Sequence, residues 1–423
     1  MVTRVIAIRG ATCRGCPARP PPTGPTMRLS AIMGHLMFSR RTDWNLTLNR
    51  FAEAVREVRA SGKEILDLTV SNPTQAGIEY DGPAILDSLR NPKSLDYDPQ
   101  PKGLLSARKA VAAYYRERGE AVDPERLVLT TSTSEGYSYI FRLLANPGDE
   151  VLVPKPSYPL FDFLAELQDV KLAGYPLLYD HGWQIDGPSL GSAVGEKTRA
   201  LVLVHPNNPT GTYVSATERE QLNQMCRARG LAMIVDEVFL DYAADGSRCP
   251  SFVTNDGALT FTLSGVSKIS ALPQMKLAWI AVSGPSADVD TAMQRLEVIA
   301  DTYLSLNAPV QLAAGTLLEQ RKKIQPQLMQ RVGANLAELD RHLGSQKSAA
   351  RLEVQGGWYA VLRVPVTQSD EDLAIALLRN TGTMLHPGHF YDFPRDGYLV
   401  LSLITPEEDF RVGMSRLLKF LGQ

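Results

Sequence analysis

The chain has 423 residues, 44% of them apolar, which is enough to bury one large core or two smaller ones. Its formal net charge of −2 gives no basic field that would favour nucleic acid or an acidic membrane as a partner. No apolar run reaches the length that a membrane-spanning helix needs, so we expect neither a nucleic-acid nor a membrane partner.

Residues 1–37 are expected to be a disordered or misannotated leader. The first 36 residues contain five arginines, no acidic residue and a Pro-rich run at 17–25. An Arg-bearing, acid-poor segment can be an organelle transit peptide, but its proline and glycine residues would break an amphipathic helix. Met27, Met33 and Met37 are further plausible starts.

The four cysteines are too few and too scattered for a disulfide framework, which favours a reducing, cytoplasmic location. Cys13 and Cys16 form a CxxC pair, but no second pair exists to complete a zinc site. We therefore expect no metal centre.

From Phe38 the apolar residues become periodic. Residues 48–60 predict a helix with one apolar face, residues 65–70 predict a strand, and the Ser-Asn-Pro-Thr sequence at 71–74 predicts a turn. The segment LDYDPQPKG at 95–103 then precedes a second helical pattern that begins at Leu104.

A strand over 127–131 is expected to lead into the helix at 135–144 through a Thr-Ser-Thr-Ser sequence. The backbone N–H groups of such a helix start, with hydroxyls beside them, can bind an anion. The alternative is a Ser/Thr N-cap without a ligand. A further strand over 150–153 is followed by a Pro-Ser-Tyr-Pro turn that contains Tyr158.

Three more predicted strands end in chemistry-bearing residues. Residues 199–204 lead into HPNNPTG at 205–211, residues 231–235 lead into Asp236-Glu237, and residues 258–263 lead into SGVSK, whose lysine is Lys268. Ligands bind at the carboxyl edge of open α/β sheets. A carboxylate such as Asp236 is costly beside an apolar strand unless a cation meets it. A desolvated lysine amine readily changes its pKa, as Schiff-base chemistry requires.

Beyond Val282 the pattern changes. Residues 288–319 and 326–343 predict long helices, the first broken near Pro309, and the segments 352–364 and 398–403 predict strands of a smaller α+β unit.

The motifs HPNNPTG, VDEVF and SGVSK with a second lysine, in this order and spacing, resemble the class I/II aminotransferases, fold-type-I enzymes that use pyridoxal 5′-phosphate. The resemblance runs from about Phe38 to the C-terminus. It implies an α/β fold with a large domain, residues 75–308, built on a mostly parallel central sheet flanked by helices. A smaller α+β domain, residues 309–423, would pack with an N-terminal segment, residues 38–74. It also implies a homodimer.

The resemblance further implies a role for each matching residue. Lys268 would hold the cofactor as a Schiff base and then move a proton at the substrate α-carbon. Asp236 would pair with the pyridine nitrogen, Asn208 would hydrogen-bond the phenolic oxygen and Tyr158 would stack on the ring. The turn containing Asn72 would face the substrate. The residues implied around the phosphate are Ser132, Thr133, Ser134, Ser267, Lys276 and, from the second subunit, Tyr97.

Several positions depart from the family pattern. Ser132 replaces a usual glycine, Lys276 replaces an arginine, and Phe239 stands where many members have a tyrosine. Val400 occupies the place of the arginine that grips the substrate α-carboxylate, which leaves the substrate open. Arg395 is the nearest candidate surrogate.

The leading hypothesis is an aminotransferase that acts on an amino acid and a 2-oxo acid. A pyridoxal-phosphate lyase or decarboxylase of the same fold is the first alternative, because the arginine is missing. A ligand-sensing regulator would carry a DNA-binding helix-turn-helix ahead of the fold, for which residues 1–36 are too short. A pseudoenzyme is disfavoured by the presence of Lys268, Asp236 and Asn208.

Overall fold

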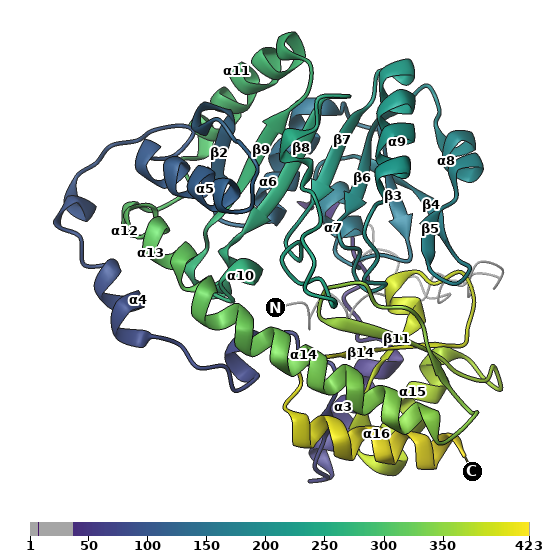
Figure 1. The fold of residues 1–423 in the computed structure, drawn as a ribbon. Helices are drawn as coiled ribbons and strands as arrows, with labels where there is room; N and C mark the ends of the chain where they lie inside the picture. Colours follow the sequence, from purple (N-terminus) through teal and green to yellow (C-terminus); the bar gives the residue numbers. More distant parts are fainter. Residues whose placement is uncertain (1–6, 8–36, 423) are drawn as a thin grey trace.

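The computed structural model describes residue 7 and residues 37–422, and its larger part is built on an eight-stranded sheet with the order β2-β9-β8-β7-β6-β3-β4-β5 (Figure 1). The neighbours from β8 to β4 pair in parallel, whereas β9 and β5 run antiparallel to the strands beside them. The predicted mostly parallel sheet is therefore confirmed. The strands are β2 (Leu127–Thr130), β3 (Glu150–Lys155), β4 (Lys171–Tyr179), β5 (Trp183–Ile185), β6 (Thr198–Val204), β7 (Ala232–Asp236), β8 (Thr260–Gly265) and β9 (Ala278–Ser283).

Helices cover both faces of this sheet, because side chains that alternate along a strand point to opposite faces. On β7, Ile234 packs with α6 and α11, whereas Met233 and Val235 join the apolar cluster that includes α9. The helices of this part are α4 (Gly82–Ser88), α5 (Leu105–Glu117), α6 (Thr133–Leu144), α7 (Phe161–Glu166), α8 (Gly187–Ala193), α9 (Ala216–Arg229), α10 (Val266–Ile269), α11 (Ser286–Tyr303), α12 (Ala308–Leu312) and α13 (Ala314–Glu319).

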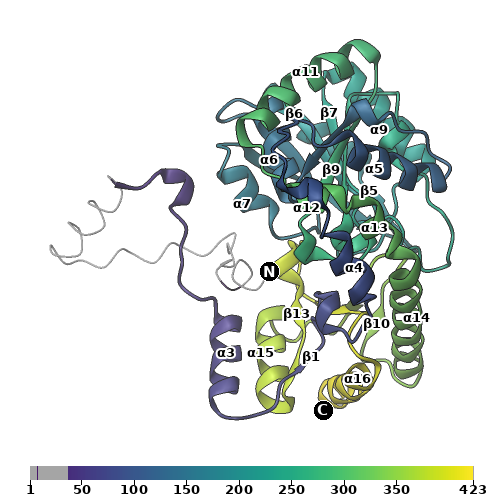
Figure 2. The ribbon, with the colours of Figure 1, turned by 90° about the vertical axis from the view of Figure 1, so that its left-hand side faces the viewer.

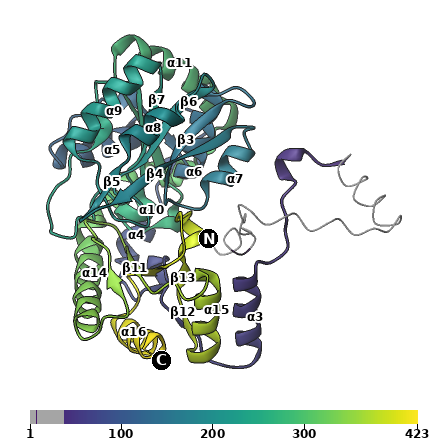
Figure 3. The ribbon, with the colours of Figure 1, turned by 90° about the vertical axis from the view of Figure 1, so that its right-hand side faces the viewer.

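The smaller part is a four-stranded antiparallel sheet with helices, and it confirms the expected α+β unit. Strand β1 pairs in parallel with β12, and α3 lies beside α15, so residues 50–67 pack with the C-terminal part of the chain (Figures 2 and 3). The elements are α3 (Arg50–Ala60), β1 (Leu66–Asp67), β10 (Ala350–Arg351), β11 (Tyr359–Arg363), α15 (Asp370–Thr381), β12 (Thr383–Met384), β13 (His386–Pro387), β14 (Tyr398–Ser402) and α16 (Glu407–Leu421).

Some predicted elements differ in extent. The strand expected over 65–70 is only the two-residue β1. Of the strand expected over 352–364, only β11 (Tyr359–Arg363) forms. The helix expected from Pro326 is α14 (Arg321–Gly344), which starts earlier because Gln320 joins it to α13 in helical conformation. Val310 and Leu317 pack in the large-sheet core, although the predicted boundary at residue 308 assigned them to the small domain. That boundary stays a prediction.

The expected leader, including its CxxC pair, lies outside the described residues except for Ala7 and Met37. Within the described part, no helix is long and apolar enough to cross a membrane.

Gly265 tests how tightly β8 packs where it leads into α10. A Cβ at this position would lie 2.8 Å from the Leu277 carbonyl oxygen and 2.9 Å from the Ala278 Cβ, in backbone that cannot easily yield. We expect Gly265→Ala to destabilise the protein by about 1–3 kcal/mol in urea unfolding. The control is Gly333→Ala in α14, where a Cβ meets nothing within 4 Å. It should gain up to about 1 kcal/mol. Equal midpoints for the two variants would contradict this packing.

Candidate functional site

Lys268 lies in the short helix α10 directly after β8, at the carboxyl edge of the sheet. Its Nζ is 5.3 Å from the ring centre of Phe239 and 4.8 Å from that of Trp358, positions from which aromatic faces attract an ammonium. Burial lowers the pKa of Lys268 to about 8, and the charge of Asp236 opposes part of that change. A substantial share of the amine is therefore neutral near physiological pH.

Asp236 ends the neighbouring strand β7, where it pairs with Val204 of β6 and Leu263 of β8. Its Oδ1 accepts a hydrogen bond from the Val238 N–H (3.1 Å), and its Oδ2 accepts one from the Tyr137 hydroxyl (3.3 Å). Burial raises the pKa of Asp236 to about 6, against the effect of these donors. The carboxylate is thus ionised at neutral pH and available to a cationic partner.

The turn after β6 holds Asn208 in a buried position. Asn207 fixes the turn by accepting hydrogen bonds from Thr210 Oγ1 (3.0 Å) and, at its carbonyl, from the Gly211 N–H (2.7 Å). The Asn208 Oδ1 is buried without a hydrogen-bond partner, and a buried polar atom in that condition calls for a ligand or water. The oxygen of the Asn208 side-chain amide is therefore available as a hydrogen-bond acceptor.

His205, in the same turn, is structural. Its Nδ1 accepts from the Val214 N–H (3.0 Å), so its Nε2 carries the proton and lies 3.3 Å from the Pro250 carbonyl. Burial lowers the pKa of His205 to about 3, which keeps the ring neutral.

The N-terminus of α6 has an N-cap residue followed by hydroxyl-bearing residues in its first turn. Ser132 is the N-cap, and its Oγ accepts from the Glu135 N–H (3.2 Å). Glu135 in turn folds back, and its Oε2 accepts from the Thr131 N–H (2.7 Å) and from Ser305 Oγ (2.9 Å). Thr133 and Ser134 form the first residues of the helix, where the helix dipole favours an anion.

Two further predicted residues flank the lysine. Ser267 precedes it in α10, and Lys276 follows in left-handed backbone (φ 54°) after a short 3-10 turn. A partly buried amine, a partly buried carboxylate, a buried side-chain amide and a helix N-terminus fit the aldehyde, ring nitrogen, phenolic oxygen and phosphate of pyridoxal 5′-phosphate.

The small part contributes aromatic residues that the sequence analysis missed. Tyr359 at the start of β11 lies 6.2 Å, ring to ring, from Phe239, and the Tyr391 hydroxyl lies 3.1 Å from His386 Nδ1. Burial raises the pKa of Tyr359 to about 12 and lowers that of His386 to about 4, so both are neutral. The glycine pair before Trp358 could have indicated these residues, because two glycines predict a turn directly before the aromatic side chains.

Three further predicted residues, Tyr97, Asn72 and Arg395, lie in exposed or turn positions. Tyr97 is 85% exposed. Asn72 caps a local 3-10 turn, where its Oδ1 accepts from Thr74 Oγ1 (2.8 Å). Arg395 is exposed, and its guanidinium lies 3.4 Å from the Tyr398 hydroxyl.

The register of the small sheet places the contact of Arg395. Tyr398 pairs with Arg363, four residues along β11 from Tyr359, or roughly 14 Å at the strand repeat. The hydroxyl that Arg395 approaches therefore belongs to the end of the sheet away from Tyr359. Val400, in the centre of β14, pairs with His386 and Val361 and is buried.

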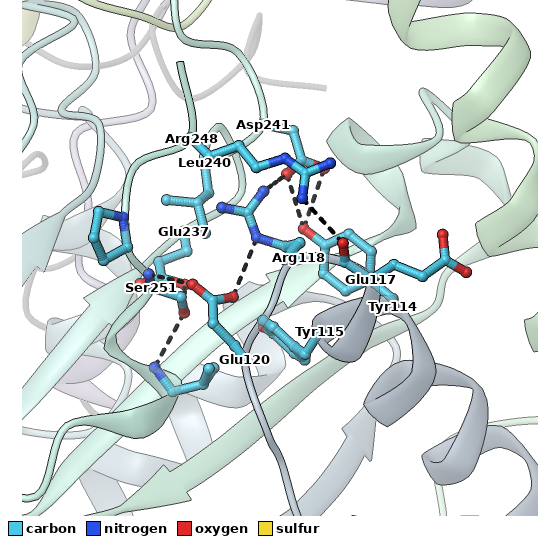
Figure 4. Close-up of polar contacts among 12 residues, drawn as sticks. Tyr114, Tyr115, Glu117, Arg118, Glu120, Glu237, Leu240, Asp241, Arg248 and Ser251 are labelled. Carbon is cyan, nitrogen blue, oxygen red and sulfur yellow. Dashed lines mark hydrogen bonds and ion pairs between the residues drawn. The ribbon is translucent and has the colours of Figure 1, made fainter. Parts of the chain in front are cut away.

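Glu237, next to Asp236, belongs to a separate buried network (Figure 4). Its carboxylate accepts from the Phe252 N–H (2.6 Å) and from Ser251 Oγ (2.5 Å), and burial raises its pKa to about 8. Among the described residues, no group of three or more His, Cys, Asp or Glu side chains is arranged to hold a metal ion.

Comparisons with known proteins agree with this geometry. Residues 63–416 match the model of the family described as aminotransferase class I and II. The chain is 27% identical over 393 residues to the glutamate-pyruvate aminotransferase AlaA of Haemophilus influenzae, covering 88% of this chain and 93% of that protein. It is also 27% identical over 375 residues to the alanine aminotransferase of Mycobacterium tuberculosis, covering 86% and 87%. The solved alanine aminotransferase from Pyrococcus furiosus matches with a TM-score of 0.81 at 22% identity, covering 91% and 99%.

The buried amine of Lys268 should destabilise the protein without a cofactor. Its folded-state pKa of about 8 lies below the ordinary 10.5, so the penalty is absent above pH 10.5, grows as pH falls and is complete below about pH 8. At 1.36 kcal/mol per pKa unit, Lys268→Met should gain roughly 3 kcal/mol at pH 7, less what the ring contacts contribute. The gain should shrink by pH 10. Urea unfolding at both pH values measures it.

The control is Lys109→Met, which removes an exposed lysine from α5. It should show no gain that depends on pH in this range. If Lys268→Met were no more stable than the parent at pH 7, the amine would not be desolvated as the structure has it.

Proposed function

The chain belongs to the class I and II aminotransferase family, and from this premise we propose that it moves an amino group between an amino acid and a 2-oxo acid, with Lys268 as the residue that holds pyridoxal 5′-phosphate. The observation that carries the proposal is the juxtaposition of a partly buried lysine and a partly buried aspartate at neighbouring strand ends, with Asn208 buried in the turn after the next strand.

The bound cofactor supplies an electron sink for the carbanion that forms at the substrate α-carbon. Four side chains of the protein would bind the cofactor or move the proton. Lys268 would hold the cofactor, and its partly neutral amine would take the proton from the substrate α-carbon. Asp236, ionised at neutral pH, would favour a proton on the ring nitrogen. Asn208 would hydrogen-bond the phenolic oxygen, and Tyr158 would lie against the ring.

The phosphate would be held at the N-terminus of α6 by Ser132, Thr133 and Ser134, together with Ser267 and Lys276. Lysine is a point charge, unlike the two-pronged guanidinium of arginine, so Lys276 would bind the phosphate with less geometric specificity.

The substrate side differs from the family pattern. Val400 pairs with Val361 and with His386, whose ring is neutral because burial lowers its pKa to about 4. We keep Asn72 and Arg395 as proposed substrate contacts. Similar proteins are named for alanine, glutamate and pyruvate, which makes these the first substrates to test. Free Cys226 and Cys249 support a reducing, cytoplasmic location.

Reduction with borohydride in the presence of pyridoxal phosphate, followed by peptide mapping, should label Lys268. Stopped-flow absorbance with single amino acids should then show conversion of the cofactor to its pyridoxamine form, because the amino group is transferred. A label on Lys276 would overturn the lysine assignment. Release of pyruvate and ammonia without that conversion would instead establish a lyase.

We further propose a homodimer in which Tyr97 completes the phosphate site of the partner. Apolar side chains are exposed on the segments around it, in contrast to the sheet core, and exposed apolar patches mark association surfaces. They are Leu86 (58% exposed), Leu95 (92%), Tyr97 (85%), Tyr303 (49%) and Leu304 (39%).

Tyr97→Phe should weaken binding of pyridoxal phosphate, because a hydroxyl donating to a charged acceptor contributes roughly 1.5–3 kcal/mol, or about 10- to 100-fold in Kd. The variant should remain a dimer in sedimentation experiments, since only one hydroxyl is lost. A fully active monomer, or unchanged cofactor affinity in Tyr97→Phe, would contradict the proposal.

A further inference from the structure

The backbone that carries Lys268 depends on side chains from elsewhere in the chain. Helix α10 has only four residues, too few to be stable by itself. At its end, the Lys268 carbonyl accepts a backbone hydrogen bond from the Ala271 N–H (3.2 Å). Three side chains also donate to carbonyls of this segment. Tyr242 Oη donates to the Lys268 carbonyl (2.6 Å), Gln325 Nε2 to that of Ile269 (2.9 Å) and Tyr80 Oη to that of Ala271 (2.9 Å).

Gln325 differs from the other two because its amide nitrogen makes a second bond. An amide nitrogen carries two protons. One goes to the Ile269 carbonyl, next to Lys268, and the other goes to Asp241 Oδ2 at 2.8 Å. Gln325 thus bridges the lysine helix and a carboxylate with a single nitrogen.

That carboxylate is a fixed anchor. Asp241 accepts from the Tyr114 hydroxyl at 3.2 and 3.1 Å and is ion-paired with Arg118 (Figure 4). Arg118 also donates to Glu120 (3.3 Å) and to the Cys249 carbonyl (3.0 Å). The side chains of Asp241 and Arg118 are 8% and 10% exposed, so their positions are set by packing as well as by charge.

Gln325 itself lies in α14, which continues into the small part of the molecule (Figure 1). There Asn335 Nδ2 donates to the carbonyls of Leu403 and Thr405, both at 2.8 Å, directly after β14. The same helix therefore contacts the small sheet at one end and the lysine helix at the other.

We propose that Gln325 is a positioning residue for Lys268, one that fixes the lysine helix against the Asp241–Arg118 pair and transmits the placement of the small part to the reacting amine. The proposal rests on the proposed function of Lys268. Gln325 touches neither substrate nor cofactor, and it acts through the Ile269 carbonyl.

Gln325→Met and Gln325→Glu test the proposal. Methionine keeps the length without a donor, and glutamate places an acceptor against Asp241 and the carbonyl. With the helix loosened, the Lys268 amine gains access to water, which reverses the cause of its low pKa. We expect the pH midpoint for acylation of Lys268, read by peptide mapping of the full cofactor-free chain, to rise from about 8 toward 10.5.

In the cofactor-loaded enzyme, kcat should fall on the order of 10- to 100-fold with KM nearly unchanged, because a displacement of about 1 Å at a reacting group costs this much. The control is Gln327→Met, two residues along α14, whose Nε2 donates to the Glu79 and Lys323 carbonyls (3.0 Å each). It should change neither the midpoint nor kcat.

An unchanged midpoint in both Gln325 variants would overturn the proposal, even if their thermal stability fell. So would an equal shift in Gln327→Met. These outcomes are separate from failure of the proposed function, which would appear in the parent protein as the absence of a borohydride label on Lys268.

Discussion

The site depends on one electrostatic constraint, namely that a lysine and an aspartate are both partly buried at neighbouring strand ends, where their charged groups lose water. Burial moves their pKa values toward each other, to about 8 for Lys268 and about 6 for Asp236, because each charged form loses water. Between about pH 6 and 8 both groups are charged, and each partly stabilises the charge of the other. A cofactor that bonds the amine and offers a cationic ring nitrogen to the carboxylate would satisfy both.

The large sheet brings these two residues together, and most of its strands were predicted from the sequence. The residue runs before HPNNPTG, Asp236 and Lys268 are continuous and apolar, as strands buried on both faces must be. Their parallel pairing places the three ends at one edge. Short strands such as β1 and β10 were poorly predicted, because two residues carry no usable period.

The parts of the site that come from the small domain could not be read from the sequence in the same way. Trp358 and His386 stand in segments whose local pattern is that of ordinary core, and only the tertiary contact of Trp358 with Lys268 gives it a function. Gln325 is similar, because nothing in a helical stretch indicates that one amide will cap another helix 56 residues away. Tyr97 and Arg395 were inferred from resemblance, and their roles stay predictions.

The Asp236-Glu237 pair shows why position in a strand matters more than residue type. Both carboxyl groups are buried and both have raised pKa values, so composition cannot distinguish them. Asp236 is the last residue of β7, and its side chain meets Tyr137 and the field of Lys268. Glu237, one residue on, accepts from Ser251 and Phe252, and the charge of Arg118 also opposes the rise that burial causes in its pKa. The alternation of the chain thus gives the two acids different surroundings, Asp236 beside Lys268 and Glu237 against the segment that follows β7.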